Sequence, residues 1–308
     1  MKKVMTICLL VLLAVLFTGC RREKKTWTFA YTCKQLGNPF FAILEETIRK
    51  EVEKDGGRLI TVDPDMDPQK QISQIEDLIK QKIDILFLNP VDSETIRPAL
   101  VSLNKANIPV INFDSEVMDI DLVAAYVGSD NRNAGYVCGL DMVKRLPNGG
   151  PIAVLDSPTR LSSRNRIDGF NEAIEGNGFT IVFLKDTRGD LPTARSHIEE
   201  MLKSYPEVTA IMGVNDPTAL GALAACQAAN RTNILIYGVD GSPAAKAEIA
   251  RRGQFAGTGA QSPISIANKS VAVAYEILNR QVYERQILVR TFIINQENID
   301  EYDINGWQ

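Results

Sequence analysis

The sequence has few of the residues on which enzymes depend. It contains one histidine, His197, within the stretch TARSHIEEML, where it falls on the charged side of a helical pattern. A solvated surface position is the better interpretation of this residue, and no other histidine is present for a Ser-His-Asp site. The chain also lacks a nucleophile elbow, a Walker loop and a G-x-G-x-x-G motif. We therefore expect neither catalysis nor a bound cofactor.

Cysteine is scarce as well. Only Cys33, Cys138 and Cys226 lie beyond the N-terminal segment, at wide spacings that match neither a metal knuckle nor a redox pair. Cys138 and Cys226 fall among small apolar residues on helical patterns, which predicts buried free thiols.

One acidic stretch, DPDMDP, follows the start of a calcium loop and then departs from it. Asp63, Asp65 and Asp67 have the spacing of the first three ligands, but Pro68 replaces the glycine and Gln74 the bidentate glutamate. Asp67 is instead predicted to cap a helix that begins with Pro68. No metal site is expected.

Long basic clusters are absent outside the short segment RREKKT. The formal net charge of −4 falls to −6 when the segment that contains Lys2 and Lys3 is removed. Such a chain offers no electrostatic footprint for nucleic acid, which is therefore not an expected partner.

Only one long apolar run occurs, from Val4 to Phe17, between MKK and TGC. A basic start, a short apolar centre and small residues at its end are typical of a secretory signal, and the run is too short to favour a membrane-spanning helix. Because TG is followed at once by Cys20, we predict a lipoprotein signal over 1–19, a lipid on Cys20 and a tether over 20–26. An ordinary signal with an incidental cysteine is the alternative. The protein is expected to be exported, either anchored at the outer face of the cytoplasmic membrane or in the periplasm.

From Thr26 onward, short apolar runs alternate with amphipathic segments. Runs such as TFAYTC, DILFLNP, IPVINFD, PIAVLDS and ILIYGVDG are continuously apolar, as strands buried on both faces are. The segments between them carry one apolar stripe at helical spacing. The alternation occurs twice, before and after YVGSDN, which predicts an α/β protein with two doubly wound parallel-sheet lobes.

Further strands are predicted near the end of the chain, in AGTGAQSP and VRTFIIN, around a helix at 264–279. They are expected to cross between the lobes and form a multi-strand hinge. The predicted lobes comprise 27–129 with 262–290, and 130–261 with 291–308.

Short polar side chains end several of the apolar runs. Asn89, Asp114, Asn215 and Asp240 close ILFLN, VINFD, IMGVN and IYGVD. Ligands of open α/β sheets bind outside the carboxyl ends of the strands, so these groups are expected to converge if the lobes face each other. Capping of the following helices is the alternative for each of them. Carboxylates accept hydrogen bonds, arginine donates them and asparagine does both, which suits sugar hydroxyls.

The stretch LGNPFFAIL raises a separate question. Phe40 and Phe41 are adjacent in the first turn of a predicted helix, where neighbouring side chains point about 100° apart. We expect that both cannot face the same core. One of them is expected to have another use, and a hydrophobic staple at the helix start is the alternative for the pair.

These motifs, taken in order, resemble the type I periplasmic sugar-binding proteins, in particular the ribose- and galactose-binding branch. The resemblance covers nearly the whole chain after the signal and is carried by GNPFFAIL, LNPVDSE, IPVINFDS, VGSDNRNAG, SSRNRIDGF, GVNDPTALGAL, YGVDGSP and AGTGAQSP. The resemblance implies ligand contacts from nine residues: Asn38, Phe40, Phe41, Asn89, Asp114, Arg166, Asn215, Asp240 and Gln261.

The resemblance also implies a function. It points to a monomeric, lipid-anchored receptor that captures a small sugar or polyol and delivers it to an ABC permease in the cytoplasmic membrane. A sensor that presents its ligand to a membrane receptor kinase or chemoreceptor is the alternative, and the sequence does not separate the two. A repressor on the same two-lobed core would need an N-terminal pair of DNA-reading helices, where a signal segment stands instead.

Two positions depart from the family pattern. Ser115 stands where relatives often have arginine, and Gly189 stands where they commonly have an aromatic residue. The pocket is therefore expected to be roomier on one side, unless Arg188 or Tyr31 fills it. We expect a pentose other than ribose, a ketose or a polyol to bind more tightly than ribose or galactose.

Overall fold

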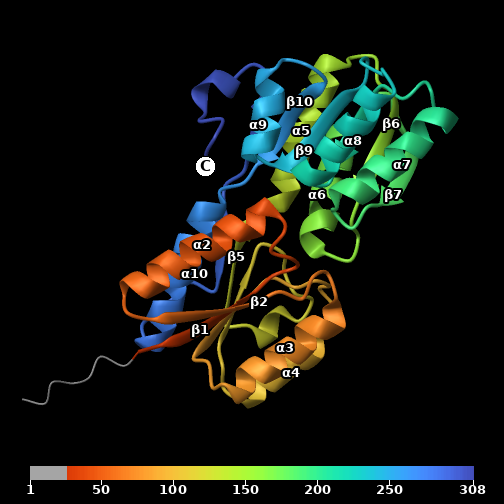
Figure 1. Cartoon of the computed structure of the whole chain (residues 1–308). Coiled ribbons are helices and arrows are strands. Elements are labelled where there is room, and N and C mark those ends of the chain that lie inside the picture. Colours follow the sequence, from red (N-terminus) through yellow and green to blue (C-terminus); the bar gives the residue numbers. More distant parts are fainter. Residues whose placement is uncertain (1–25) are drawn as a thin grey trace, which may run out of the picture.

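The computed structural model describes residues 26–308, so the predictions for the signal 1–19, for Cys20 and for most of the tether 20–26 lie outside the described residues. Residues 26–308 form two lobes, the first at the bottom of Figure 1 and the second at the top. Each lobe contains a six-stranded sheet. The predicted fold class, two α/β lobes with mostly parallel sheets, is confirmed.

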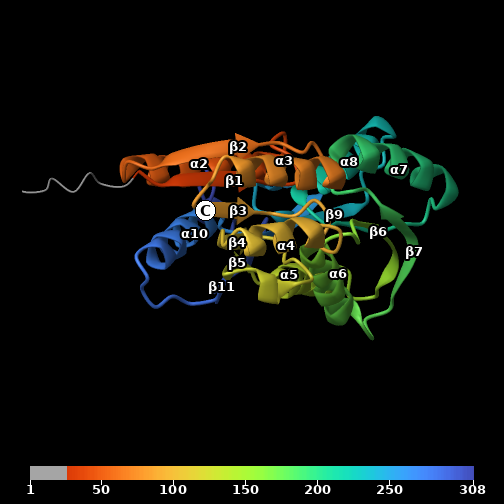
Figure 2. The ribbon, with the colours of Figure 1, turned by 90° about the horizontal axis from the view of Figure 1, so that it is seen from below.

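The first lobe is built on an all-parallel sheet. Its strands lie in the spatial order β2 (Arg58–Val62), β1 (Thr28–Thr32), β3 (Ile85–Leu88), β4 (Val110–Phe113), β5 (Ala125–Ser129) and β11 (Gln286–Val289), as Figure 2 shows from below. Helices α2 (Pro39–Lys54) and α10 (Pro263–Leu278) cover one face, and α3 (Pro68–Lys80) and α4 (Arg97–Lys105) cover the other. The 3-10 helix η1 (Ile120–Leu122) precedes β5. Strands β3 and β4 are buried along their full length, as their unbroken apolar sequences require.

The second lobe repeats this arrangement. Its strands lie in the spatial order β7 (Phe179–Asp186), β6 (Gly150–Asp156), β8 (Ala210–Gly213), β9 (Leu235–Asp240), β10 (Phe255–Ala260) and β12 (Phe292–Asn295). Helices α7 (Leu191–Ser204), α8 (Asp216–Ala228) and α9 (Pro243–Ala250) cover one face, and α5 (Asn131–Arg145) and α6 (Leu161–Ile174) cover the other. Strand β12 is antiparallel to β10 and is followed by η2 (Ile299–Glu301). In both sheets the strand order reverses beside the first strand, which is where ligands of such folds bind.

Helix starts follow local signals in the sequence. Asn38 Oδ1 accepts the Phe40 amide at 3.0 Å and caps α2. Asp67 caps α3 by accepting the amides of the second and third helical residues at 2.8 and 3.1 Å, with Pro68 as the first residue. The prediction that Asp67 caps a helix is therefore confirmed.

The chain passes between the lobes three times, after β5, after β10 and between β11 and β12. Two of these crossings are tied together, because Thr291 Oγ1 donates to the Asp130 carbonyl at 2.9 Å and Asn133 Nδ2 donates to the Thr291 carbonyl at 3.0 Å. Short parallel crossings of this kind form a hinge about which two lobes rotate.

The last residues of the chain reach back to the first lobe. Residues 303–308, here called the C-terminal tail, end between the lobes in Figure 1. Lys246 Nζ on α9 donates to the carbonyls of Asp303 and Gly306 at 2.6 and 2.7 Å. The Trp307 ring meets the Phe40 ring of the first lobe edge-on, with centroids 5.9 Å apart. The tail, predicted with the second lobe, thus contacts both.

Cys33, Cys138 and Cys226 are buried free thiols, which confirms the prediction made for the last two. None of the helices within residues 26–308 combines the length and apolar character needed to cross a bilayer.

Candidate functional site

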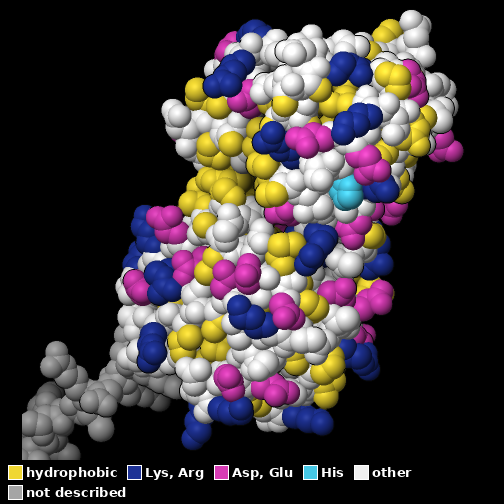
Figure 3. Space-filling view, turned by 45° about the vertical axis from the view of Figure 1, so that its right-hand side comes forward, with side chains coloured by type: hydrophobic (Ala, Val, Ile, Leu, Met, Phe, Trp, Pro, Cys, Tyr) yellow, Lys and Arg dark blue, Asp and Glu magenta, His cyan; other side chains and the backbone are white. Residues whose placement is uncertain are grey.

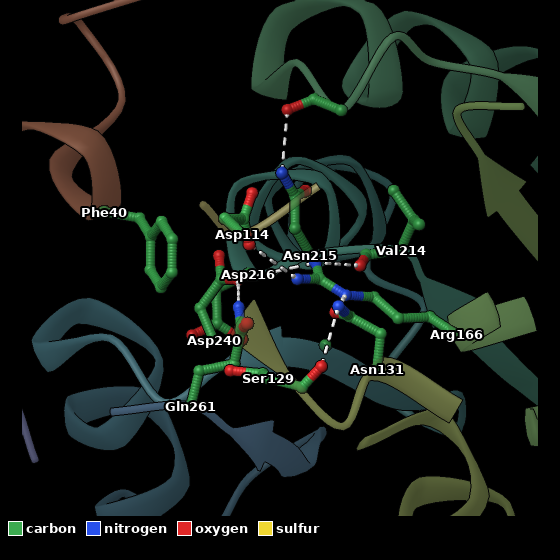
Figure 4. Close-up of polar contacts among 12 residues, drawn as sticks. Phe40, Asp114, Ser129, Asn131, Arg166, Val214, Asn215, Asp216, Asp240 and Gln261 are labelled. Atoms are coloured by element: carbon green, nitrogen blue, oxygen red, sulfur yellow. Dashed lines mark hydrogen bonds and ion pairs between the residues drawn. The ribbon is translucent and has the colours of Figure 1, made fainter. Parts of the chain in front are cut away.

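Polar side chains follow corresponding strands of the two lobes. Asn89 comes directly after β3 and Asn215 two residues after β8, each the third strand of its lobe. Asp114 directly follows β4 and Asp240 ends β9, each the fourth strand of its lobe. Figure 4 shows that Asp114, Asp240 and Asn215 gather around Arg166. None of the nine predicted ligand-binding residues is more than 8% exposed.

Arg166 joins the two lobes. Its Nη2 lies 3.8 Å from Asp114 Oδ1 of the first lobe, and its Nη1 lies 3.6 Å from Asp240 Oδ1 of the second. The guanidinium is held by further bonds, because Nε donates to Asn131 Oδ1 at 2.8 Å and Nη1 to the Val214 carbonyl at 3.0 Å. One fixed cation therefore faces a carboxylate from each lobe (Figure 4).

The position of Arg166 depends on a close contact between helices α5 and α6. A Cβ on Gly135 would lie 1.8 Å from the Arg166 carbonyl oxygen, and a Cβ on Gly169 would lie 1.9 Å from the Arg132 carbonyl oxygen. Only glycine at both points allows the two backbones to touch. That approach brings Arg166 on α6 within hydrogen-bond reach of Asn131 on α5.

The two strand-end aspartates have unusual backbone conformations. Asp114 has φ of 60° and Asp240 has φ of 146°, both in the region that favours glycine. Such conformations cost on the order of 1–3 kcal/mol each and cluster at binding and catalytic sites. Their carboxylates are held in place, since Asn89 Nδ2 donates to Asp114 Oδ2 at 3.0 Å and Gln261 Nε2 donates to Asp240 Oδ1 at 2.9 Å.

In the described part of the chain, one oxygen of the Asp114 carboxylate and the amide oxygen of Gln261 lack a hydrogen-bond donor. Burial raises the pKa of Asp114 and Asp240, and the Arg166 guanidinium opposes part of that rise. Within residues 26–308, Asp114 Oδ1 and Gln261 Oε1 accept no hydrogen bond. Hydroxyl donors from a ligand would complete these acceptors and stabilise the charged carboxylates.

The asparagines differ in what they do for the helices. Asn215 caps α8, with its Oδ1 accepting the Thr218 amide at 3.0 Å, while its Nδ2 donates to the Gly189 carbonyl at 3.0 Å. Asn89 caps no helix, because its amide bonds Asp114 and α4 begins well after it. The capping interpretation is therefore confirmed for Asn215 and wrong for Asn89.

The two phenylalanines are not divided between core and cleft as expected. Phe40 and Phe41 are 3% and 2% exposed and belong to the same apolar cluster. Their rings meet edge-on at 5.5 Å, which is possible because the cluster wraps around the first turn of α2. The expectation that both cannot face one core was wrong, although Figure 4 shows the Phe40 ring beside the strand-end aspartates.

Of the two residues expected to fill the space beside Gly189, Tyr31 does not do so. The Tyr31 hydroxyl donates to the Phe41 carbonyl at 2.9 Å inside the first lobe. The Arg188 side chain is exposed and lines a cleft between the lobes together with Lys34 and Arg160. Instead, a Cβ on Gly189 would lie 2.7 Å from Arg160 Nη2 and 3.3 Å from Lys34 Nζ.

Reasoning from the sequence missed Lys34, Arg160 and Asn131. Each lies within two to four residues of a strand end, where a polar residue is usually solvated. In the sequence, Asn131 stood out only as one residue of the stretch VGSDNRNAG, which contributes to the family resemblance. A signal for the other two was available: both basic residues follow the first strand of a lobe, where the strand order reverses.

Other candidate sites are weaker. A hollow of about 880 Å³ on the second lobe is lined by residues of α5, α6 and β7, such as Arg132, Glu172 and Ile181, and contains none of the strand-end groups. Residues 26–308 hold no group of three acidic, histidine or cysteine side chains that could bind a metal ion. His197 is half-buried on α7 and reaches the surface in Figure 3.

The fold and these polar groups define a two-domain binding protein, in which polar side chains from equivalent strand ends of two lobes meet around Arg166. The chain belongs to the periplasmic binding protein family, whose domain model matches residues 29–281.

Proteins similar in sequence and in structure support this assignment. The chain is 31% identical to the ribose import binding protein of Salmonella typhimurium over 279 residues, which are 90% of this chain and 93% of that protein. It is 32% identical to the ribose import binding protein of Bacillus subtilis over 300 residues, which are 93% of this chain and 97% of that protein. A solute binding protein of an ABC transporter from Mycobacterium smegmatis, solved with bound glycerol, superposes with a TM-score of 0.86 at 26% identity and covers 90% of this chain and 96% of that one.

Proposed function

We propose that the protein is an extracytoplasmic solute-binding protein that captures a small sugar or polyol and delivers it to an ABC importer. The observation that carries this proposal is the pair of strained aspartates, Asp114 and Asp240, which end the fourth strands of opposite lobes and share Arg166. Relatives named for ribose, D-apiose and xylitol binding lend it support.

The same geometry explains how binding drives closure. A ligand that contacts both lobes stabilises the closed arrangement, whereas one that contacts a single lobe has no such effect. We assign hydrogen bonds to ligand hydroxyls to Asn38, Asn89, Asp114, Arg166, Asn215, Asp240 and Gln261, and apolar contact to Phe40 and Phe41. The closed monomer then docks on its permease.

The proposal includes a lipid anchor at Cys20. Cys20→Ser is expected to release the protein from the membrane fraction with ligand affinity unchanged, because both lobes are built from residues 26–308. Fractionation followed by calorimetry measures both effects. Release of the unmodified protein by high salt alone contradicts a covalent anchor.

The proposed function is tested by finding the ligand. Native mass spectrometry of freshly purified protein can identify a molecule carried through purification, and a thermal-shift panel of sugars and polyols extends the search. A ligand present at about a hundred times its Kd stabilises the protein by about 2.7 kcal/mol. We expect a shift from at least one of these compounds and no turnover. Chemical conversion of a bound sugar, or the absence of any shift, contradicts the proposal.

A further inference from the structure

Two buried basic side chains have no role in the function proposed above. Lys34 follows β1 and Arg160 follows β6, the first strand of each lobe, and the two residues are 3% and 5% exposed. Lysine and arginine are almost never buried to this degree without a charged partner. Their presence at this point therefore requires an explanation.

Neither side chain forms a close ion pair within the described residues, and the carboxylates that act on them, Asp190 and Asp186 on Lys34 and Asp114, Asp240 and Asp156 on Arg160, do so from a greater distance. Among residues 26–308, no carboxylate lies within 4.0 Å of the charged atoms of Lys34 or Arg160, whereas Arg166 has two within that distance. Lys34 Nζ donates to the Arg188 carbonyl, and Arg160 Nε has no hydrogen-bond partner in the described part of the chain. Burial, together with the neighbouring Arg160, lowers the pKa of Lys34 to about 6.

The two basic groups converge on one point. The position that a Cβ on Gly189 would occupy lies 2.7 Å from Arg160 Nη2, 3.1 Å from Asn215 Nδ2 and 3.3 Å from Lys34 Nζ. Three nitrogen donors from both lobes therefore pack against Gly189, and only the absence of a side chain at this position allows them to meet. A cleft of about 180 Å³ between the lobes is lined by the same two basic residues and Arg188, with Asp92 and Asp186 also in its lining.

We propose that the ligand is an acidic sugar, whose carboxylate lies beside Gly189 between Lys34 and Arg160 while its hydroxyls bind Asp114 and Asp240. This inference rests on the proposed function and specifies its substrate class. The carboxylate gives Arg160 a counter-charge within hydrogen-bond reach, favours the charged form of Lys34 and accepts charge-assisted hydrogen bonds from both. The aspartates and Arg166 remain for the hydroxyls, as in binding a neutral sugar.

The main-chain amides at the nearby helix starts already donate hydrogen bonds within the protein, which favours a carboxylate over a phosphate. Phosphate sites commonly use free amides at a helix N-terminus. Here the first two amides of α6, those of Leu161 and Ser162, donate to Ser93 Oγ and Ser115 Oγ of the first lobe, both at 3.3 Å. Asp190 caps α7 and accepts the Thr193 amide at 3.0 Å. The donors that remain are the side chains of Lys34 and Arg160 and the side-chain amide of Asn215. This small set matches the single charge of a carboxylate better than the larger charge of a phosphate.

Calorimetry with matched pairs of compounds tests the inference. The pairs are galacturonate with galactose, gluconate with sorbitol, and ribose 5-phosphate with ribose. We expect a carboxylate to bind most tightly, by roughly tenfold or more over its neutral partner, because a charged hydrogen-bonded pair contributes about that much. Tightest binding of the phosphate overturns the carboxylate assignment, and tightest binding of a neutral compound overturns the inference.

Variants locate the carboxylate. Lys34→Met and Arg160→Gln are each expected to weaken binding of the acidic compound by roughly tenfold. The affinity for its neutral partner should change less than about threefold. Lys70→Met on α3 and Arg195→Gln on α7 are exposed controls and should change neither. Thermal unfolding of the free variants shows that they fold. Equal loss for acidic and neutral compounds overturns the inference.

The outcome also separates this inference from the proposed function. Tight binding of a neutral sugar, unaffected by Lys34→Met, refutes the acidic ligand and leaves the solute-binding function intact. Failure of the wild-type protein to bind any member of the three pairs or of the wider sugar panel refutes both.

Discussion

The charge of Lys34 depends on the groups that face it. Burial is the main reason for its low pKa of about 6, to which Arg160 and Arg188 contribute, while Asp190 and Asp186 oppose them. In the free protein at neutral pH the amine is therefore mostly uncharged. A carboxylate placed beside it favours the ammonium form and raises the pKa again.

This coupling predicts the pH dependence of binding. Galacturonate binding is expected to take up about one proton at about pH 8, and its Kd should rise up to roughly tenfold per pH unit above pH 6. Calorimetry in buffers of different ionisation enthalpy measures the uptake. Lys34→Met should remove both effects, and a wild-type Kd that stays constant between about pH 6 and pH 8 contradicts the prediction.

The stability of the free protein should rise with pH, whereas the affinity for galacturonate should fall. The folded pKa of Lys34 is below its unfolded value of 10.5, so between these values the unfolded chain binds a proton that the folded chain does not. The contribution of Lys34 to the free energy of unfolding therefore rises as pH increases above about 6. Subtracting the unfolding curves of Lys34→Met from those of the wild type isolates this contribution from that of the buried carboxylates.

The strand-end aspartates are expected to carry much of the affinity for hydroxyls. Asp114→Asn and Asp240→Asn each remove a buried charged acceptor but keep a side chain that tolerates positive φ. Hydrogen bonds to charged groups contribute about 1.5–3 kcal/mol, so each variant should lose roughly tenfold or more in affinity. His197→Ala on α7 should bind normally. Normal binding by both aspartate variants would place the site elsewhere.

At the scale of single residues, sequence could predict the groups that follow strands but not which charges become buried. Asn89, Asp114, Asn215 and Asp240 were identified because parallel strands end at one edge of a sheet. Lys34 looked like a solvated loop residue, because its burial comes from the opposite lobe, through the Arg188 carbonyl. Contacts between lobes leave no periodic signal in the chain.

Among the elements, the C-terminal tail is placed to favour closure. Lys246 on α9 holds it to the second lobe, and Gln308 Nε2 donates to the Asp240 carbonyl at 3.1 Å. Trp307 contacts Phe40 of the first lobe. The sequence did not predict this role, because DINGWQ has neither helical nor strand periodicity.

Removal of the tryptophan ring tests the role of the tail. An edge-on aromatic pair contributes about 0.5–1.5 kcal/mol, so Trp307→Ala should weaken ligand binding roughly two- to tenfold and speed dissociation. Tyr283→Ala is a matched control, since Tyr283 packs against the same cluster from the far end of the first lobe. Stopped-flow measurement of dissociation compares the two. Equal effects in both variants would indicate loss of stability rather than of closure.

For the whole molecule, the twofold alternation of strands and helices was enough to predict two lobes of one fold. The way the lobes face each other was not predictable, since few side chains span the gap. Two arginines on α6 both reach carboxylates of the first lobe but differ in how deeply they are buried. Arg166 is 5% exposed and faces Asp114 and Asp240, whereas Arg164 is 37% exposed and lies 3.8 Å from Glu94 of the first lobe.

This contrast gives a test of closure. Arg166→Met leaves two buried carboxylates without the cation that lies within 4.0 Å of both, a loss that typically costs 3–5 kcal/mol, so ligand affinity should fall by on the order of 100-fold or more. Small-angle scattering at a ligand concentration that compacts the wild type should find this variant still open. Lowering the pH should partly restore compaction, because protonated carboxyls no longer repel. Arg164→Met removes an exposed pair that contributes little, so it should compact and bind like the wild type. If the two variants behave alike, Arg166 is not the group that couples ligand binding to closure.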